Sequence, residues 1–126
     1  MSYKIKIILL FTIIYCNATT DIITEQQMEQ ILKTKKIVVA NFHGEKWCPD
    51  SQRYKKPFSK LEEKHFRIAT FIKLDKDKLK DLFKKYNVGS VPQTIIFKFA
   101  NEVFRTGSTD KFFIEDKLID SLKNIK

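Results

Sequence analysis

Four short runs of apolar residues, rich in β-branched and aromatic side chains, interrupt an otherwise polar chain. They cover residues 37–42, 69–74, 93–99 and 102–106, and each has the length of a strand. Only Ala100-Asn101 separates the last two runs, a spacing that predicts a β-hairpin, and Gly107 ends the second of them.

Between these runs, apolar residues recur at the spacing of a helix face. Thr24-Glu25-Gln26-Gln27 has the order of a capping box and predicts the start of a first helix with Met28, Ile31 and Leu32 on its apolar side. A second helix is predicted from Pro49 to about Lys64, with a kink at Pro57, because a proline inside a helix removes a hydrogen bond. The third is predicted to begin at Asp77 and the fourth to end the chain. Their apolar faces are Leu79, Leu82, Phe83 and Tyr86 in the third and Ile114, Leu118, Leu122 and Ile125 in the fourth.

The predicted order is helix, strand, helix, strand, helix, hairpin, helix. Strands joined by helices pair in parallel through right-handed crossovers, whereas a hairpin adds antiparallel pairs. We therefore predict an α/β fold in which a mixed central β-sheet is flanked by helices on both faces. With 126 residues, of which 43% are hydrophobic, the chain has room for one such domain.

The most informative motif is Trp47-Cys48-Pro49-Asp50-Ser51, between the strand at 37–42 and the second helix. Proline suits the first position of a helix, because the amide it lacks would have no partner there, so Cys48 is the predicted cap. Unpaired N–H groups and the helix dipole favour a thiolate at that place. The carboxylate of Asp50 opposes it.

With three further matches, this motif resembles the thioredoxin superfamily. The matches, in order, are the strand that ends in Asn41-Phe42, the motif itself, Ser90-Val91-Pro92 before the run at 94–97, and a final amphipathic helix. The resemblance covers nearly all of the chain beyond its N-terminal segment. It implies a thioredoxin fold in which Pro92 is cis and faces Cys48. Trp47, Pro49, Val91 and Pro92 are then the expected substrate-binding residues, beside a groove where an extended substrate pairs with the backbone.

The chain departs from the family pattern in its chemistry. Ser51 stands where a dithiol site has its second cysteine, and Asn41 stands where the family usually has a buried Asp that accepts a proton. Trp-Cys-Pro-Asp resembles the thioredoxin-related proteins that carry Trp-Cys-Pro-Asp-Cys. The Cys-x-x-Ser form instead resembles single-cysteine members of the protein disulfide isomerase family, and both subfamilies stay open.

The first 18 residues have the order of a secretory signal peptide: Lys4 and Lys6, an apolar run at 7–16, and then small residues around Ala18. The run is shorter than the roughly 20 residues that a membrane span needs. We predict cleavage after Ala18 and a thioredoxin-like domain at 19–126, with a retained signal anchor or an N-terminal strand as alternatives. The cleaved chain would have one cysteine and no stable membrane span. It would be secreted or reside in the endoplasmic reticulum lumen, or in the periplasm of a bacterial host.

The formal net charge is +9, but the lysines are interleaved with acidic residues and no nucleic-acid motif accompanies them. The pattern favours solvated helix faces, and we expect no nucleic-acid partner. His43 and His65 are too few and too isolated for a zinc site, and no glycine-rich phosphate loop is present in the sequence. We expect neither a metal nor a resident cofactor.

Cys48 is the candidate nucleophile, with a small buried hydrophobe as the alternative. Ser51 either donates a hydrogen bond to the thiolate or caps the helix. A thiolate that attacks a disulfide forms a mixed disulfide, which a second thiol must resolve. Because Ser51 cannot do so, glutathione or a client thiol would have to. The expected function is disulfide exchange or isomerisation in client proteins, rather than net dithiol reduction. The alternative is a non-catalytic module or chaperone that binds peptides through the same groove.

Overall fold

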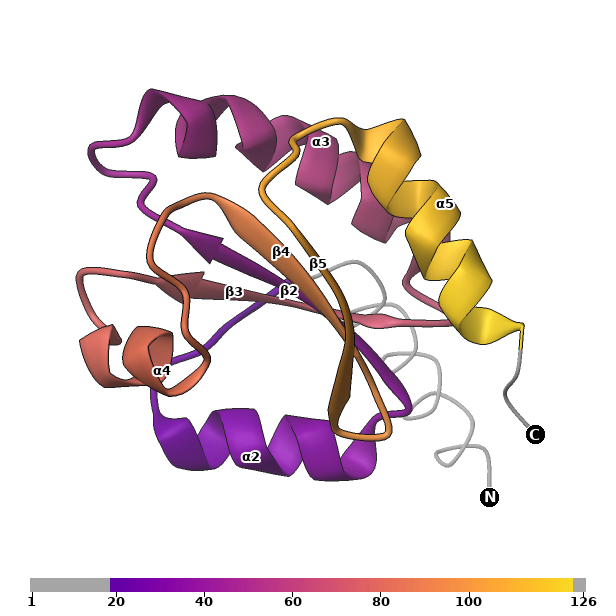
Figure 1. Ribbon diagram of the computed structural model, residues 1–126. Coiled ribbons are helices and arrows are strands. Elements are labelled where there is room, and N and C mark those ends of the chain that lie inside the picture. Colours follow the sequence, from indigo (N-terminus) through magenta and orange to yellow (C-terminus); the bar gives the residue numbers. More distant parts are fainter. Residues whose placement is uncertain (1–18, 124–126) are drawn as a thin grey trace, which may run out of the picture.

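The computed structural model describes residues 19–123 as one α/β unit (Figure 1). The predicted signal peptide and Ile125 lie outside the described residues. The elements of the α/β unit are β1 (Thr20–Asp21), α2 (Glu25–Thr34), β2 (Ile37–His43), α3 (Pro49–His65), β3 (Thr70–Asp75), α4 (Lys80–Lys85), β4 (Gln93–Lys98), β5 (Asn101–Thr106) and α5 (Lys111–Leu122).

The strands form a five-stranded sheet in the order β1-β3-β2-β4-β5. β3 pairs in parallel with β1 and β2, whereas β4 pairs antiparallel with β2 and β5. Helices α3 and α5 cover one face, and α2 and α4 cover the other (Figure 1). This arrangement confirms the predicted mixed sheet with helices on both faces.

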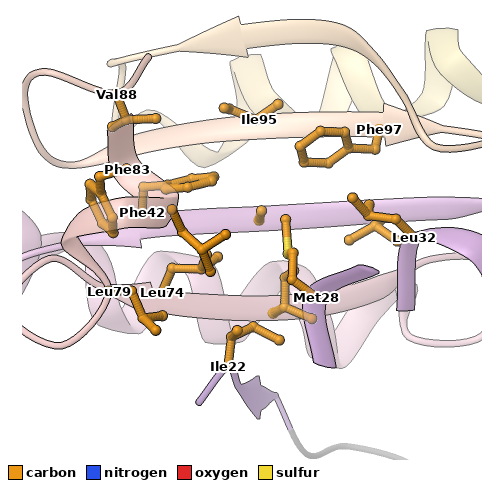
Figure 2. Close-up of a cluster of buried hydrophobic side chains, with 14 residues drawn as sticks. Ile22, Met28, Leu32, Phe42, Leu74, Leu79, Phe83, Val88, Ile95 and Phe97 are labelled. Atoms are coloured by element: carbon orange, nitrogen blue, oxygen red, sulfur yellow. The ribbon is translucent and has the colours of Figure 1, made fainter. Parts of the chain in front are cut away.

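Strand β2 lies at the centre of the sheet, and all seven of its residues are buried. Its side chains alternate between two cores. Val38, Ala40 and Phe42 pack with α2 and α4 (Figure 2), whereas Ile37 and Val39 pack with α3 and α5. Burial on both faces explains why this strand is a continuous apolar run rather than an alternating one. The carboxyl end of β2 is thereby fixed in the sheet, and the Cys48 motif follows it directly.

The structure differs from the prediction in one missed strand and at several boundaries, of which the start of α4 and the hairpin turn differ most clearly. Strand β1 was not predicted, because two residues give no periodic signal. Helix α4 begins at Lys80 rather than Asp77: the N–H groups of Lys78 and Leu79 donate to the carbonyl of Asp75, so the chain forms a turn there first. The hairpin turn is formed by Phe99 and Ala100, whose φ values of 50° and 68° suit a tight two-residue connection, so Phe99 does not extend β4.

The predicted capping box is confirmed in its first half. The Thr24 hydroxyl accepts a hydrogen bond from the Gln27 N–H at 3.1 Å. The Gln27 side chain, however, accepts from the N–H of Ile23 at 2.7 Å, one residue before the cap. Helix α3 runs from Pro49 to His65 with Pro57 inside it, one residue longer than predicted.

Candidate active site

The turn that joins β2 to α3 is closed on Gly44. The N–H groups of Trp47 and Cys48 both donate to the Gly44 carbonyl, at 3.1 and 2.8 Å. The Gly44 N–H in turn donates to the Ser51 hydroxyl oxygen at 3.0 Å. Cys48 is the N-cap residue of α3, as predicted, and Pro49 follows at the first helical position. The Cys48 thiol makes no side-chain capping hydrogen bond and is directed instead at the Val91 carbonyl.

Gly44 is a site residue that the sequence reasoning missed. A Cβ atom at this position would lie 2.6 Å from Cζ2 of Trp47, so the indole ring occupies the space that a side chain would need. The Trp47 Nε1–H donates to the Asp77 carboxylate at 3.1 Å, and the ring remains 51% exposed. The indole is thus held at its edges and presents a surface beside Cys48. The available signal in the sequence was a glycine between the apolar run at 37–42 and the Trp-Cys pair.

The environment of Cys48 lowers the pKa of its thiol. The largest cause is the Ser51 backbone N–H, followed by the Ser51 hydroxyl, because both donors favour the charged thiolate. Burial and the Asp50 carboxylate act in the opposite direction, but the Asp50 N–H also stabilises the thiolate. The helix start and the Asp50 carboxylate therefore have opposite effects on the pKa of Cys48, as predicted, and the effect of the helix start is larger.

The other side of the sulfur faces the segment before β4. The Val91–Pro92 peptide bond is cis, and the Val91 carbonyl oxygen lies 3.7 Å from the Cys48 sulfur. A Cβ atom at Gly107 would lie 3.8 Å from the Pro92 carbonyl, so the loop after β5 borders the same place. The fold thus brings Cys48, Ser51 and Val91 together, with Trp47 and Pro92 beside them. Pro49 is exposed at the first turn of α3.

Comparison with known proteins identifies the family and the fold. The family described as Thioredoxin matches residues 19–123. The chain belongs to the thioredoxin family. It is 30% identical over 105 residues to thioredoxin of Mycoplasma genitalium, which covers 83% of this chain and 98% of that protein. Mouse glutaredoxin-3 is 29% identical over 90 residues, but this chain spans only 26% of its length.

Solved thioredoxins share the fold. The crystal structure of thioredoxin from Trypanosoma brucei brucei superposes with a TM-score of 0.81 at 20% identity, covering 89% of this chain and 97% of that one. Members of the thioredoxin family act on thiols and disulfides, so this chain is a thioredoxin-like protein of a redox family.

Strand β2 of this thioredoxin-like chain has an amide, Asn41, at the position where the family usually has an acid. Asn41 is fully buried, and neither its amide oxygen nor its nitrogen has a hydrogen-bond partner among residues 19–123. Its neighbour across the antiparallel pair is Thr94, whose hydroxyl lies 2.7 Å from the Tyr54 hydroxyl. Because Asn41 cannot ionise, the interior is neutral at this position of β2.

A second network of polar side chains supports the turn between β2 and α3 from the side of β3. The sequence analysis did not predict it. The Lys73 ammonium lies 2.6 Å from the Glu45 carboxylate, and the Glu45 N–H donates to Nδ1 of His43 at 3.1 Å. Burial lowers the pKa of His43, so the ring is neutral with its proton on Nε2. Lys73 and Glu45 are far apart in the sequence, so no local pattern predicts that they meet.

Residues 19–123 are the part of the chain that the structure describes. No cluster of three or more His, Cys, Asp or Glu side chains there is suited to hold a metal ion. No helix there is both long and apolar enough to cross a membrane.

Proposed function

We propose that this thioredoxin-family chain exchanges or isomerises disulfides in client proteins through the single thiol of Cys48. The observation that carries the proposal is the position of Cys48 at the start of α3. There its pKa is lowered by Ser51, and its sulfur lies 3.7 Å from the Val91 carbonyl. Ser51 stands one helical turn on, so no second thiol of the same helix turn can resolve a mixed disulfide.

The chemistry balances without net oxidation or reduction. The Cys48 thiolate attacks one sulfur of a client disulfide, a Cys48–client disulfide forms, and the other client sulfur leaves as a thiolate. A second thiol, either glutathione or a client thiol, then attacks the mixed disulfide and releases Cys48. Trp47, Pro49, Val91 and Pro92 line the place where the client chain would lie. Neither a metal nor a resident cofactor takes part in this scheme.

A secretory location is part of the proposal and is supported by the sequence of residues 1–18. We propose cleavage after Ala18 and residence in the endoplasmic reticulum lumen, secretion, or export to the periplasm of a bacterial host. Disulfide exchange suits those oxidising compartments. N-terminal sequencing of the protein made in a secreting host would return Thr19 as the first residue, whereas an intact Met1 end would contradict processing.

Disulfide isomerisation of a test protein with scrambled disulfides, in the presence of a little glutathione, tests the proposal. We expect the Cys16→Ser chain to accelerate recovery of the native disulfides and to form a mixed disulfide that mass spectrometry detects under non-reducing conditions. The further change Cys48→Ala should abolish both. Equal recovery with and without Cys48, or insulin reduction as fast as that of a dithiol thioredoxin, would contradict the proposal.

A non-catalytic peptide-binding module or chaperone is the second candidate, and the buried neutral side chain of Asn41 favours it. The proton acceptor of the family is missing at this position. Under this alternative, Cys48→Ala would bind client peptides as tightly as the unchanged chain and would suppress their aggregation equally well. The same variant therefore separates the two functions.

A further inference from the structure

A groove of about 520 Å³ lies between α4 and the loop that leads to β4. This volume is within the range of ligand and peptide clefts. Its floor includes Phe83 and Val88, whose side chains also belong to the core shown in Figure 2. The lining residues are Lys76, Lys80, Phe83, Lys84, Asn87, Val88 and Gly89.

All the charged residues that line this groove are lysines. Lys80 and Lys84 are one helical turn apart on α4 and share a face, and no acidic residue lines the groove. Lys76 extends from the end of β3 and donates to the Gly89 carbonyl at 3.3 Å. Within residues 19–123, none of the three ammonium groups forms an ion pair. The groove therefore complements an anionic segment.

The wall opposite α4 is held in place by Arg105 of β5. The Arg105 guanidinium donates to the carbonyls of Tyr86 and Asn87, at 2.6 and 2.9 Å, and pairs with both carboxylate oxygens of Glu102. Asn87 has a φ of 55°, and this turn directs the chain toward Gly89. A wall that is already ordered loses little conformational entropy when a partner binds.

One lining residue of the groove, Gly89, belongs to the segment that leads to the active site. Gly89 lies two residues before Val91, whose carbonyl is 3.7 Å from the Cys48 sulfur. Two residues span at most about 7 Å. We therefore expect a client chain that lies along the Val91 backbone to reach Gly89 within a few residues of its reacting cysteine.

We propose that the groove of Lys76, Lys80 and Lys84 recognises an acidic segment of the client protein, a few residues from the cysteine that reacts with Cys48. The inference rests on the proposed function and adds its client class. The lysines attract and orient the acidic segment, which raises the rate of encounter with Cys48. They take no part in the thiol chemistry itself.

The test uses two synthetic peptides with one cysteine each, activated as a disulfide with thionitrobenzoate. One carries Asp and Glu beside the cysteine, and the other carries Asn and Gln. The Cys48 thiolate attacks the peptide sulfur, the Cys48–peptide disulfide forms, and thionitrobenzoate leaves and is measured by absorbance. All proteins are full chains with Cys16→Ser, so that Cys48 is the only thiol.

Three proteins are compared: the chain without further change, the groove variant Lys76→Gln/Lys80→Gln/Lys84→Gln, and a control variant. The control, Lys33→Gln/Lys35→Gln/Lys36→Gln, removes the same charge from exposed positions just before β2, at the opposite end of that strand from Cys48.

We expect the unchanged chain and the control to react with the acidic peptide roughly tenfold faster than with the amide peptide at low salt, and less so as salt is added. The groove variant should react equally with both. A preference that survives in the groove variant, or that the control also loses, would overturn the inference.

Failure of the proposed function gives a different result, in which Cys48 reacts with neither peptide. The groove is then tested by fluorescence anisotropy of the labelled, thiol-blocked acidic peptide on Cys48→Ala proteins. Binding that only the groove variant loses supports the acidic subsite, whereas equal binding by all variants overturns it. A single-stranded oligonucleotide that displaces the peptide better than unlabelled peptide does would overturn the assignment to protein clients.

Discussion

The Ser51 hydroxyl oxygen accepts a hydrogen bond from the Gly44 N–H at 3.0 Å. With this N–H bound to its oxygen, the one proton of the hydroxyl can be donated to the Cys48 sulfur, and this donation lowers the pKa of the thiol. The serine in place of the second cysteine thus links the turn after β2 to the acidity of Cys48.

Replacement of Ser51 by Ala should therefore raise the pKa of Cys48 and slow its alkylation by iodoacetamide at neutral pH. The Ser51 backbone N–H remains, so part of the effect should persist. The variant also leaves the Gly44 N–H without its partner, which should cost about 1–3 kcal/mol of unfolding free energy. The measurements are the pH profile of alkylation and urea unfolding.

Ser59→Ala is the matched control for this prediction. Ser59 lies on the same helix but is exposed, so its removal should change neither the alkylation profile nor the unfolding midpoint. A Cys48 pKa that is the same in the Ser51→Ala variant and in this control would remove Ser51 from the thiolate site.

Replacement of Ser51 by Cys should produce a dithiol site. The second thiol would lie one helical turn from Cys48 and could attack the Cys48–client disulfide from within the same chain. Release of the client would then need no glutathione. We expect insulin reduction driven by dithiothreitol to rise about tenfold or more above that of the unchanged chain. Cys48→Ala/Ser51→Cys is the control, and activity that survives in it would place the nucleophile elsewhere.

Much of this arrangement follows from local sequence patterns. The apolar run of β2, the proline at the start of α3 and the helical spacing in α5 each predict an element without reference to the rest of the fold. The Glu45–Lys73 pair and the contact of Arg105 with Tyr86 and Asn87 join residues far apart in the chain, and only the folded sheet brings them together. Strand β1 was missed because it is too short to show any periodicity.

Gly44→Ala should displace the indole of Trp47, since a Cβ atom would lie 2.6 Å from Cζ2 of the ring. Overpacking of this kind costs about 1–3 kcal/mol. We expect lower stability in urea, easier quenching of the fluorescence of the single Trp, and slower reaction of Cys48 with client peptides. Gly89→Ala is the control for stability and fluorescence, because a Cβ atom there meets nothing within 4 Å. Unchanged Trp fluorescence in Gly44→Ala would contradict the packing of the Trp47 indole against Gly44.

Asn41→Asp should restore an ionisable group at this position of β2 at a cost in stability. The new carboxyl would be fully buried, and the nearby Lys73 is already paired with Glu45. Its folded pKa should therefore lie above the unfolded value of about 3.9. The variant should lose about 1–3 kcal/mol at neutral pH and recover as pH falls through the folded pKa. Urea unfolding at several pH values measures this, and a constant loss at all pH values would contradict it.

Glu62 gives the last pH-dependent prediction. This side chain of α3 is 5% exposed, and burial raises its pKa, although the Thr19 hydroxyl donates to its carboxylate and opposes the effect. A carboxyl with a raised folded pKa weakens the fold as pH rises through that pKa, and has no effect well below the unfolded value of about 4.3.

Glu62→Gln should therefore gain stability relative to the unchanged chain as pH rises from about 4 to 7. Glu63→Gln is the control: Glu63 is exposed, pairs with Lys60 in a surface pair of little energetic weight, and its charge is the smallest cause of the raised pKa of Glu62, so this variant should reproduce little of the effect. Urea midpoints of the three proteins across this pH range decide the matter. If the difference between Glu62→Gln and the unchanged chain stays flat with pH, or if Glu63→Gln reproduces it, the burial of Glu62 does not control its ionisation.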